Sequence, residues 1–228
     1  AWARRCLLAV GVGDEHARTV AGALVQTSLW GIDSHGIARL THYLARIQAG
    51  SVDPRPRLTV TDTGPCTAQM HGGHGLGIVV CYVAMDHALS LVRRSGVGIV
   101  GIGESSHCGA IGLYTRHAAA QGMIGIAFTH ADAIVAPHGG TQKFLGTNPL
   151  SIAFPQAGGP PVCLDMATSS IPWNRVMNAR RERAALPDGV AVDAAGATTR
   201  DADAAAALLP LGGAGYGHKG YALALMID

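Results

Sequence analysis

Apolar residues recur every three to four positions along the first fifty residues, and this spacing predicts two amphipathic helices. The first helix covers residues 14–29. Residues 31–36 interrupt the pattern, and a second helix carries its apolar stripe over residues 37–47. It ends at Gly50, because glycine adopts the left-handed cap of a helix without strain. The N-terminal region is therefore expected to be helical.

Further along the chain, alternating positions and short apolar runs indicate strands between helices. Segments 58–61 and 66–70 flank an Asp-Thr-Gly-Pro turn and predict an antiparallel hairpin. We expect helices at 75–94 and 110–121, a buried strand at 97–102, further strands at 123–129, 151–154 and 162–166, and a polar stretch with a short Ala-rich helix within 184–207. This order of elements implies an α/β protein with a mixed sheet.

Composition narrows the class of protein. With 228 residues, 48% of them hydrophobic, 14% charged and 31 glycines, the chain can bury a substantial core. The net charge is +2, and no run of lysine and arginine is long enough to follow a phosphate backbone, so a nucleic-acid partner is not expected. The longest apolar stretch, 76–92, contains Asp86 and His87 side by side, so no membrane span is expected.

The spacing of the cysteines and histidines indicates the cell compartment and whether a metal site is expected. Five widely spaced cysteines without a Cys-x-x-Cys pair indicate a reducing, cytoplasmic compartment. His71 and His74 have no third ligand at a recognisable spacing, so no metal site is predicted. Because the chain opens at Ala1 without Met and stops at Asp228 inside an apolar run, we expect it to be part of a longer protein.

Residues 33–39 carry the densest group of reactive side chains. His35 and Arg39 are four positions apart, so a continuous helix would place both on one face, where the arginine binds a carboxylate and the histidine meets the oxygen on the neighbouring carbon. Imidazole, with an ordinary pKa near ~6.5, can accept a proton during alcohol oxidation and return it during ketone reduction. This geometry suits a 2-hydroxy acid. The alternative is that Asp33 or Ser34 only caps the helix and Arg39 is solvated.

Two kinds of phosphate-binding signal are present. Residues 104–110 lie between a predicted strand and a predicted helix, where backbone N–H groups and the helix dipole favour an anion such as a cofactor phosphate. Two Gly-x-Gly-x-x-Gly matches occur, at 96–101 and 215–220. The first lies inside the predicted strand that it should follow, and the second lacks both a clear preceding strand and the acidic residue that should follow. We interpret these glycines as points of close backbone packing.

Six segments together resemble the type-2 malate/L-lactate dehydrogenase family. They are residues 33–36 with Arg39, 106–110, 146–149, 165–169, 209–213 and 218–221, and they cover nearly the whole chain. Members of this family include dehydrogenases of malate, lactate, sulfolactate and ureidoglycolate, and reductases of diketogulonate and cyclic imino acids. The resemblance implies an NAD(P)-dependent dehydrogenase that acts on the CH–OH group of a small 2-hydroxy acid, or on the matching 2-oxo acid.

The resemblance also implies an architecture. The fold is a mixed, largely antiparallel sheet flanked by helices that binds NAD or NADP without a Rossmann unit, usually in a homodimer. Residues 1–70 would form a helical, substrate-site region, and residues 71–228 the NAD(P)-binding domain, with a C-terminal segment of that domain missing.

Roles for single residues follow from the matching positions. His35 is expected to be the proton donor and acceptor, Ser34 its relay partner and Arg39 the ligand of the substrate carboxylate. In some family members the catalytic base lies at the position of His107, but His35 is preferred because Arg39 is predicted beside it. The cofactor-binding set comprises His107, Cys108, Gly109, Ala110, Ile111, Thr147, Asp165, Met166, Ala167, Thr168, Ser169, His218 and Lys219.

One departure bears on the substrate. Imine-reducing relatives carry a glycine and then an acidic residue where this chain has Asn174 and Arg175. A cyclic imine is therefore less favoured, and an acid with a second anionic or polar group is more favoured. The alternatives are a reductase of a cyclic imino acid or diketo sugar acid, a metal-dependent hydrolase, and an inactive oligomerisation scaffold on the same fold.

Overall fold

The computed structural model describes all 228 residues, which form two compact units. Unit 1 comprises residues 1–125 and 153–162, and unit 2 comprises residues 126–152 and 163–228. The sequence predicted a boundary at residue 70 between a substrate-binding region and a cofactor-binding domain. That boundary stays a prediction. Among the helices, none combines the length and apolar character that crossing a bilayer requires.

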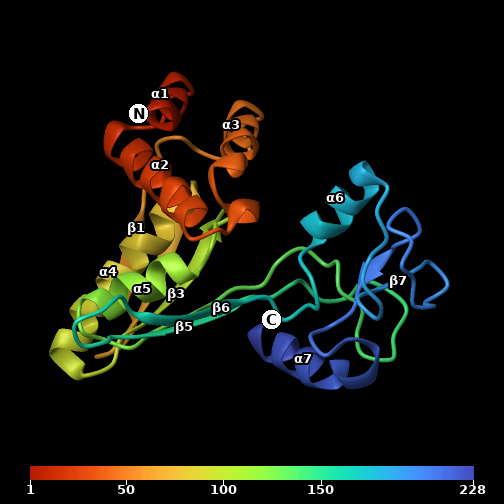
Figure 1. The fold of residues 1–228 in the computed structure, drawn as a ribbon. Coiled ribbons are helices and arrows are strands. Elements are labelled where there is room, and N and C mark those ends of the chain that lie inside the picture. Colours follow the sequence, from red (N-terminus) through yellow and green to blue (C-terminus); the bar gives the residue numbers. More distant parts are fainter. The chain divides into compact units, whose positions relative to one another are not determined.

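Unit 1 begins with three α-helices: α1 (Trp2–Ala9), α2 (Asp14–Leu29) and α3 (Leu40–Gln48) (Figure 1). The bounds of α2 are those predicted, because Val20, Leu24 and Thr27 are fully buried along one face. The second helix is shorter at its start than predicted. Two short 3-10 turns, 33–35 and 37–39, precede α3.

Gly36 separates these two turns. Its backbone packs so closely on α2 that an added Cβ would lie 2.1 Å from the Ser28 Oγ, and that same hydroxyl accepts a hydrogen bond from the Ile37 N–H at 2.9 Å. The continuous helix expected from residue 37 is therefore wrong in its first turn, because packing of the chain against α2 outweighs the helical periodicity.

A three-stranded mixed sheet lies beside these helices. Strand β1 (Thr59–Asp62) pairs antiparallel with β2 (Thr67–Gly75), as the predicted hairpin requires, and β3 (Ile99–Ser105) pairs parallel with β2. The helix α4 (Gly77–Ser95) packs on β2 and β3, and both α2 and α5 (Gly112–Ala120) contact α4.

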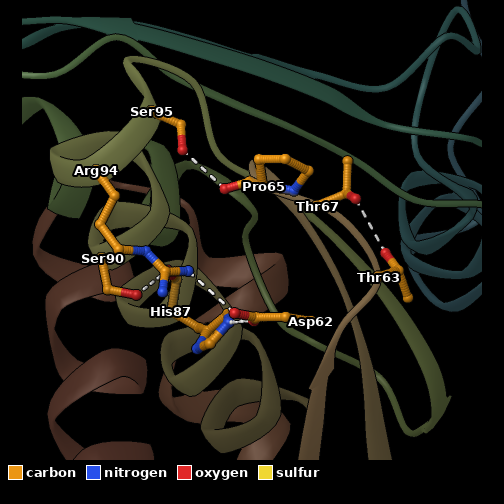
Figure 2. Close-up of polar contacts among 8 residues, drawn as sticks. All are labelled: Asp62, Thr63, Pro65, Thr67, His87, Ser90, Arg94 and Ser95. Atoms are coloured by element: carbon orange, nitrogen blue, oxygen red, sulfur yellow. Dashed lines mark hydrogen bonds and ion pairs between the residues drawn. The ribbon is translucent and has the colours of Figure 1, made fainter.

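The turn of the hairpin is fastened to α4 by hydrogen bonds (Figure 2). Asp62 Oδ1 lies 2.7 Å from His87 Nε2, Asp62 Oδ2 accepts a bond from Arg94 Nη2 at 3.0 Å, and Ser95 Oγ donates to the Pro65 carbonyl at 2.7 Å. These contacts join the loop end of the hairpin to the last turns of α4.

Strand β3 differs from its prediction in burial. Val100 packs against the core formed by Met70, Val80 and Ala84, whereas Ile99 and Ile102 are 58% and 39% exposed. The expectation of a fully buried strand was therefore wrong. An apolar run in the sequence does not reveal how much of each side chain the neighbouring elements cover.

A second three-stranded sheet has the order β4-β5-β6, with β4 at Gly125–Phe128, β5 at Leu150–Phe154 and β6 at Val162–Met166. These strands match the predicted ones to within two residues. Together with the first sheet they confirm the mixed α/β class, although the strands form several small sheets flanked by helices rather than one.

Unit 2 also contains α6 (Trp173–Glu182), α7 (Gly213–Ile227) and a two-stranded sheet of β7 (Ala191–Val192) and β8 (Ala207–Leu208) (Figure 1). The short Ala-rich helix expected within 184–207 does not form. Arg180 donates hydrogen bonds to the carbonyls of Ala202 and Ala205 at 2.7 and 3.0 Å, and the Ala206 N–H bonds to Val192. These tertiary bonds take up backbone groups that a helix would use.

Candidate active site

The site in unit 1 starts from the two 3-10 turns that replace the predicted helix. The Arg39 Nε donates to the Ser34 carbonyl at 2.8 Å, and the Ser34 hydroxyl lies 2.9 Å from the His35 Nδ1. The expected geometry, with His35 and Arg39 stacked four positions apart on a continuous helix, is therefore wrong. The turns nevertheless place Ser34, His35 and Arg39 together, because the arginine folds back over the serine.

His107 enters the site from the loop between β3 and α5. Its ring stacks on that of His35, with 5.6 Å between centroids and 20° between planes. The neighbouring Ser106 fixes the loop, since its hydroxyl accepts a bond from the Gly77 N–H at 3.0 Å and donates one to the Gly75 carbonyl at 2.8 Å. A Cβ added at Gly77 would lie 2.1 Å from the Ser106 carbonyl oxygen, so the start of α4 sets the position of the loop.

Tyr43, on α3, is a site residue that the sequence analysis missed. It is 1% exposed, and its hydroxyl lies 2.7 Å from the His107 Nδ1. The Gly109 N–H reaches the same nitrogen at 3.2 Å. A usable signal was present, because Tyr43 falls on the buried stripe of its helix and a buried phenol almost always finds a polar partner.

Burial and positive charge keep both histidines neutral. Burial, followed by the Arg39 guanidinium, lowers the pKa of His35 from 6.5 to about 4. For His107, burial and then the nearby His35, Arg39, His42 and Arg46 lower the pKa to about 3. Burial is also the main cause of the raised pKa of Tyr43. A neutral imidazole beside a guanidinium is the arrangement needed to accept a proton next to a bound anion.

The loop that carries His107 also holds the unit 1 members of the predicted cofactor set, residues 107–111. The Cys108 carbonyl accepts a hydrogen bond from the Tyr114 hydroxyl, and Gly109 adopts a positive φ of 72°. Residue 111 caps the start of α5, so the loop leads into the N-terminus of a helix, as predicted. The backbone N–H groups at such a helix end suit a phosphate.

Unit 2 joins several other predicted cofactor residues through hydrogen bonds. The Thr147 carbonyl accepts bonds from the Thr168 N–H and Oγ1 at 2.9 and 3.1 Å, and the Thr168 carbonyl accepts one from the Leu211 N–H at 2.8 Å. Ser169 forms an antiparallel bridge with Pro210. Segments 147–148, 165–169 and 209–211 therefore lie together within this unit.

The helix α7 presents His218 and Lys219 on its exposed surface, with the His218 ring 5.6 Å from that of His138. Hydroxyls, backbone N–H groups and a lysine are groups that hold the phosphates and ribose of a dinucleotide, so the predicted set fits such a cofactor chemically. The glycines of the two Gly-x-Gly-x-x-Gly matches pack closely only in part. A Cβ at Gly220 would lie 2.5 Å from Leu211 backbone atoms, and one at Gly98 would lie 2.1 Å from the Ala88 carbonyl oxygen, whereas Cβ atoms at Gly96 and Gly215 would meet nothing within 4 Å.

His71 and His74, the histidine pair considered for a metal, are not among the predicted site residues. His71 lies in β2 and His74 near its end, and the structure contains no group of three or more His, Cys, Asp or Glu side chains placed to hold a metal ion. None of the five cysteines forms a disulfide.

Comparison with known proteins gives a consistent result over the full chain. The family model described as malate/L-lactate dehydrogenase matches residues 1–228. The chain is 42% identical to the malate dehydrogenase of Pyrococcus abyssi over 98% of its length, and 40% identical to the NAD(+) ureidoglycolate dehydrogenase of Escherichia coli over 97%. It spans 63% and 62% of the length of those two relatives. The crystal structure of malate dehydrogenase from Entamoeba histolytica superposes on the whole chain with a TM-score of 0.94 and 33% identity, and the chain covers 66% of that structure.

Proposed function

The chain belongs to the malate/L-lactate dehydrogenase family, and we propose that the protein transfers a hydride between NAD or NADP and a small 2-hydroxy or 2-oxo acid. One observation supports this proposal above the others. The turns at 33–39 place a neutral imidazole, His35, beside a guanidinium, Arg39, in a partly buried cluster. A 2-hydroxy acid needs such a pair, because its carboxylate and its reacting hydroxyl are on neighbouring carbons.

Arg39 is the proposed ligand of the substrate carboxylate. Its Nε is engaged by the Ser34 carbonyl, which fixes the plane of the guanidinium. Its two Nη nitrogens can then bind both oxygens of a carboxylate in parallel, a geometry that lysine cannot reproduce. This orients the substrate with the C2 oxygen toward the imidazoles.

His35 is the proposed proton acceptor in oxidation and donor in reduction. The Ser34 hydroxyl contacts Nδ1, which orients the ring and directs Nε2 to the substrate oxygen. With a pKa of about 4 the ring is neutral at physiological pH and ready to accept the hydroxyl proton. Ser34 serves as the relay partner of that ring. A proton acceptor positioned in this way contributes about 100- to 10,000-fold to a rate.

The proposed cofactor-binding residues are 107–111 in unit 1 and Thr147, 165–169, His218 and Lys219 in unit 2. When bound, the nicotinamide supplies or accepts the hydride. The dehydrogenase family model matches the whole chain, and the relatives compared above are dehydrogenases. This favours a dehydrogenase over a metal-dependent hydrolase or an inactive scaffold.

The departure from imine-reducing relatives at Arg175 supports a finer assignment of the substrate. A second cation suits an acid with an additional anionic group, as in a dicarboxylic 2-oxo acid, better than a cyclic imine or a diketo sugar acid. From the wide spacing of the five cysteines we propose a reducing, cytoplasmic location, and by analogy with the family we propose a homodimer.

A substrate screen of the full-length protein tests the proposal. Monocarboxylic and dicarboxylic 2-oxo acids are each mixed with NADH or NADPH, and the absorbance of the reduced nicotinamide is followed. We expect turnover of at least one 2-oxo acid, abolished by His35→Ala. A protein that binds neither cofactor and turns over none of the acids would contradict the proposed function.

A further inference from the structure

Two hydrogen-bond donors converge on one ring nitrogen of His107. The backbone N–H of Gly109 lies 3.2 Å from Nδ1, and the Tyr43 hydroxyl lies 2.7 Å from the same atom. A backbone N–H can only donate, so Nδ1 accepts that bond and carries no proton. The Tyr43 hydroxyl, facing an unprotonated nitrogen, must then donate as well.

The state of the ring follows from this arrangement. A neutral imidazole has one protonated nitrogen, so the proton of His107 is on Nε2. The surroundings favour the neutral form, because the ring is partly buried and faces His35, His42, Arg39 and Arg46 without a carboxylate partner. Burial also keeps Tyr43 protonated and able to donate.

We propose that Tyr43 is a positioning residue that, with the Gly109 N–H, holds His107 as the Nε2–H tautomer, so that His107 donates a hydrogen bond to the reacting oxygen of the substrate while His35 exchanges the proton. This inference rests on the proposed function. The two stacked imidazoles would then have different roles, acid–base catalysis for His35 and hydrogen-bond donation for His107. The sequence alone does not show which histidine has which role. In 2-oxo acid reduction, His107 polarises the C2 carbonyl and keeps its own proton. His35 first takes up a proton from solvent, which the negative charge of the bound carboxylate favours, and then donates that proton to form the hydroxyl.

The local packing explains why the phenol can act in this way. Tyr43 is 1% exposed and anchored in the buried stripe of α3. Its phenol therefore cannot swing away from Nδ1 without disturbing the packing. His107 is thus poorly suited to act as the base, because its unprotonated nitrogen is occupied by two donors.

The test combines nitrogen NMR with kinetics on the full-length enzyme. In protein with ¹⁵N-labelled histidine, His107→Gln assigns the His107 signals, and we expect an unprotonated Nδ1 and a protonated Nε2 in the wild type. In Tyr43→Phe, we expect the Nδ1 signal to shift and part of the population to move to the Nδ1–H tautomer. Turnover should fall about tenfold, with KM and cofactor affinity changed less than about twofold, because one donor to the ring is lost.

Tyr82→Phe provides a matched control, because Tyr82 lies on α4, contacts Tyr114 and His117, and loses the same atom away from His107. This control should leave both the His107 signals and turnover unchanged. A protonated Nδ1 in the wild type would overturn the proposal, and so would a folded Tyr43→Phe enzyme with unchanged His107 signals and unchanged turnover. If the tautomer is as expected but the wild type reduces no 2-oxo acid, the proposed function and the donor role fail while the tautomer assignment stands.

Discussion

The rings of His35 and His107 stack at 5.6 Å although they come from separate elements, a 3-10 turn and the loop after β3. No carboxylate raises the pKa of either ring, and the neighbouring Arg39 guanidinium opposes protonation of both. The pair is therefore uncharged at neutral pH, and a bound substrate carboxylate would be the first negative charge in the cluster.

Replacing His35 should remove the proposed proton transfer. In full-length His35→Ala we expect turnover to fall about 100- to 10,000-fold, while the affinity for the reduced cofactor changes little. Steady-state kinetics and titration of cofactor fluorescence measure the two quantities. Equal losses in turnover and cofactor affinity would instead indicate a structural role for His35.

Replacing Arg39 by lysine should weaken substrate binding more than chemistry. The charge is kept, but the bidentate contact with a carboxylate is lost, so KM for the 2-oxo acid should rise about 10- to 100-fold. Arg46→Lys, at an exposed position on α3, the helix that follows Arg39, is the matched control and should leave KM unchanged. A KM that does not change in Arg39→Lys argues against the carboxylate-binding role.

The low pKa values of the two histidines predict how stability depends on pH. Below pH 6.5 the two histidines bind protons in the unfolded chain but stay neutral in the folded protein. The free energy of unfolding is therefore highest above pH 6.5. It decreases as the pH falls toward about 4 for His35 and about 3 for His107. Each group contributes a slope of at most about 1.4 kcal/mol per pH unit.

Urea unfolding between about pH 7 and pH 5 measures this slope. His35→Gln removes one titrating group from the cluster, so its stability should decline less steeply than that of the wild type. His130→Gln, at an exposed position in unit 2, should follow the wild type. Parallel curves for all three proteins would show that His35 does not titrate as stated.

Removing the Asp62 carboxylate should loosen the hairpin from α4. Its bonds to Arg94 and then His87 hold the pKa of Asp62 below 3.8, so the stabilisation is present above that pH and is lost as the carboxylate is protonated (Figure 2). Asp62→Asn should lower the thermal midpoint slightly at neutral pH and low salt, and less in high salt, since the contacts are exposed. A loss that does not depend on salt would point to packing instead.

Reversing the charge at Arg175 tests the substrate assignment. Arg175→Asp should lower kcat/KM for dicarboxylic 2-oxo acids by about tenfold or more relative to monocarboxylic ones, because an attractive contact becomes repulsive. Arg181→Asp makes the same charge change on an exposed part of the same helix and serves as the control. The same kcat/KM ratio in both variants and the wild type would argue against a role for Arg175 in selecting the substrate.

Features set by local spacing could be predicted from the sequence. The helix α2, the β1–β2 hairpin and strand β6 follow directly from apolar periodicity and turn residues. In the rejected Gly-x-Gly-x-x-Gly matches, Gly98 and Gly220 lie at points of close packing, whereas Gly96 and Gly215 do not. The grouping of Ser34, His35 and Arg39 was also predicted, although by a different backbone path.

Features set by contacts between distant segments could not be predicted. Gly36 breaks the expected helix because it packs on Ser28, and the Ala-rich segment loses its helix to the guanidinium of Arg180. The bond between Tyr43 and His107 joins two segments whose proximity no local pattern encodes. Such contacts depend on how the elements pack, and packing outweighs local propensity wherever the two disagree.

The absence of a side chain at Gly77 has a consequence for how this site can vary. Any larger residue there would collide with the Ser106 carbonyl and displace the neighbouring ring of His107, even though residue 77 contributes no functional group. Random mutagenesis should therefore recover folded but inactive variants at this position.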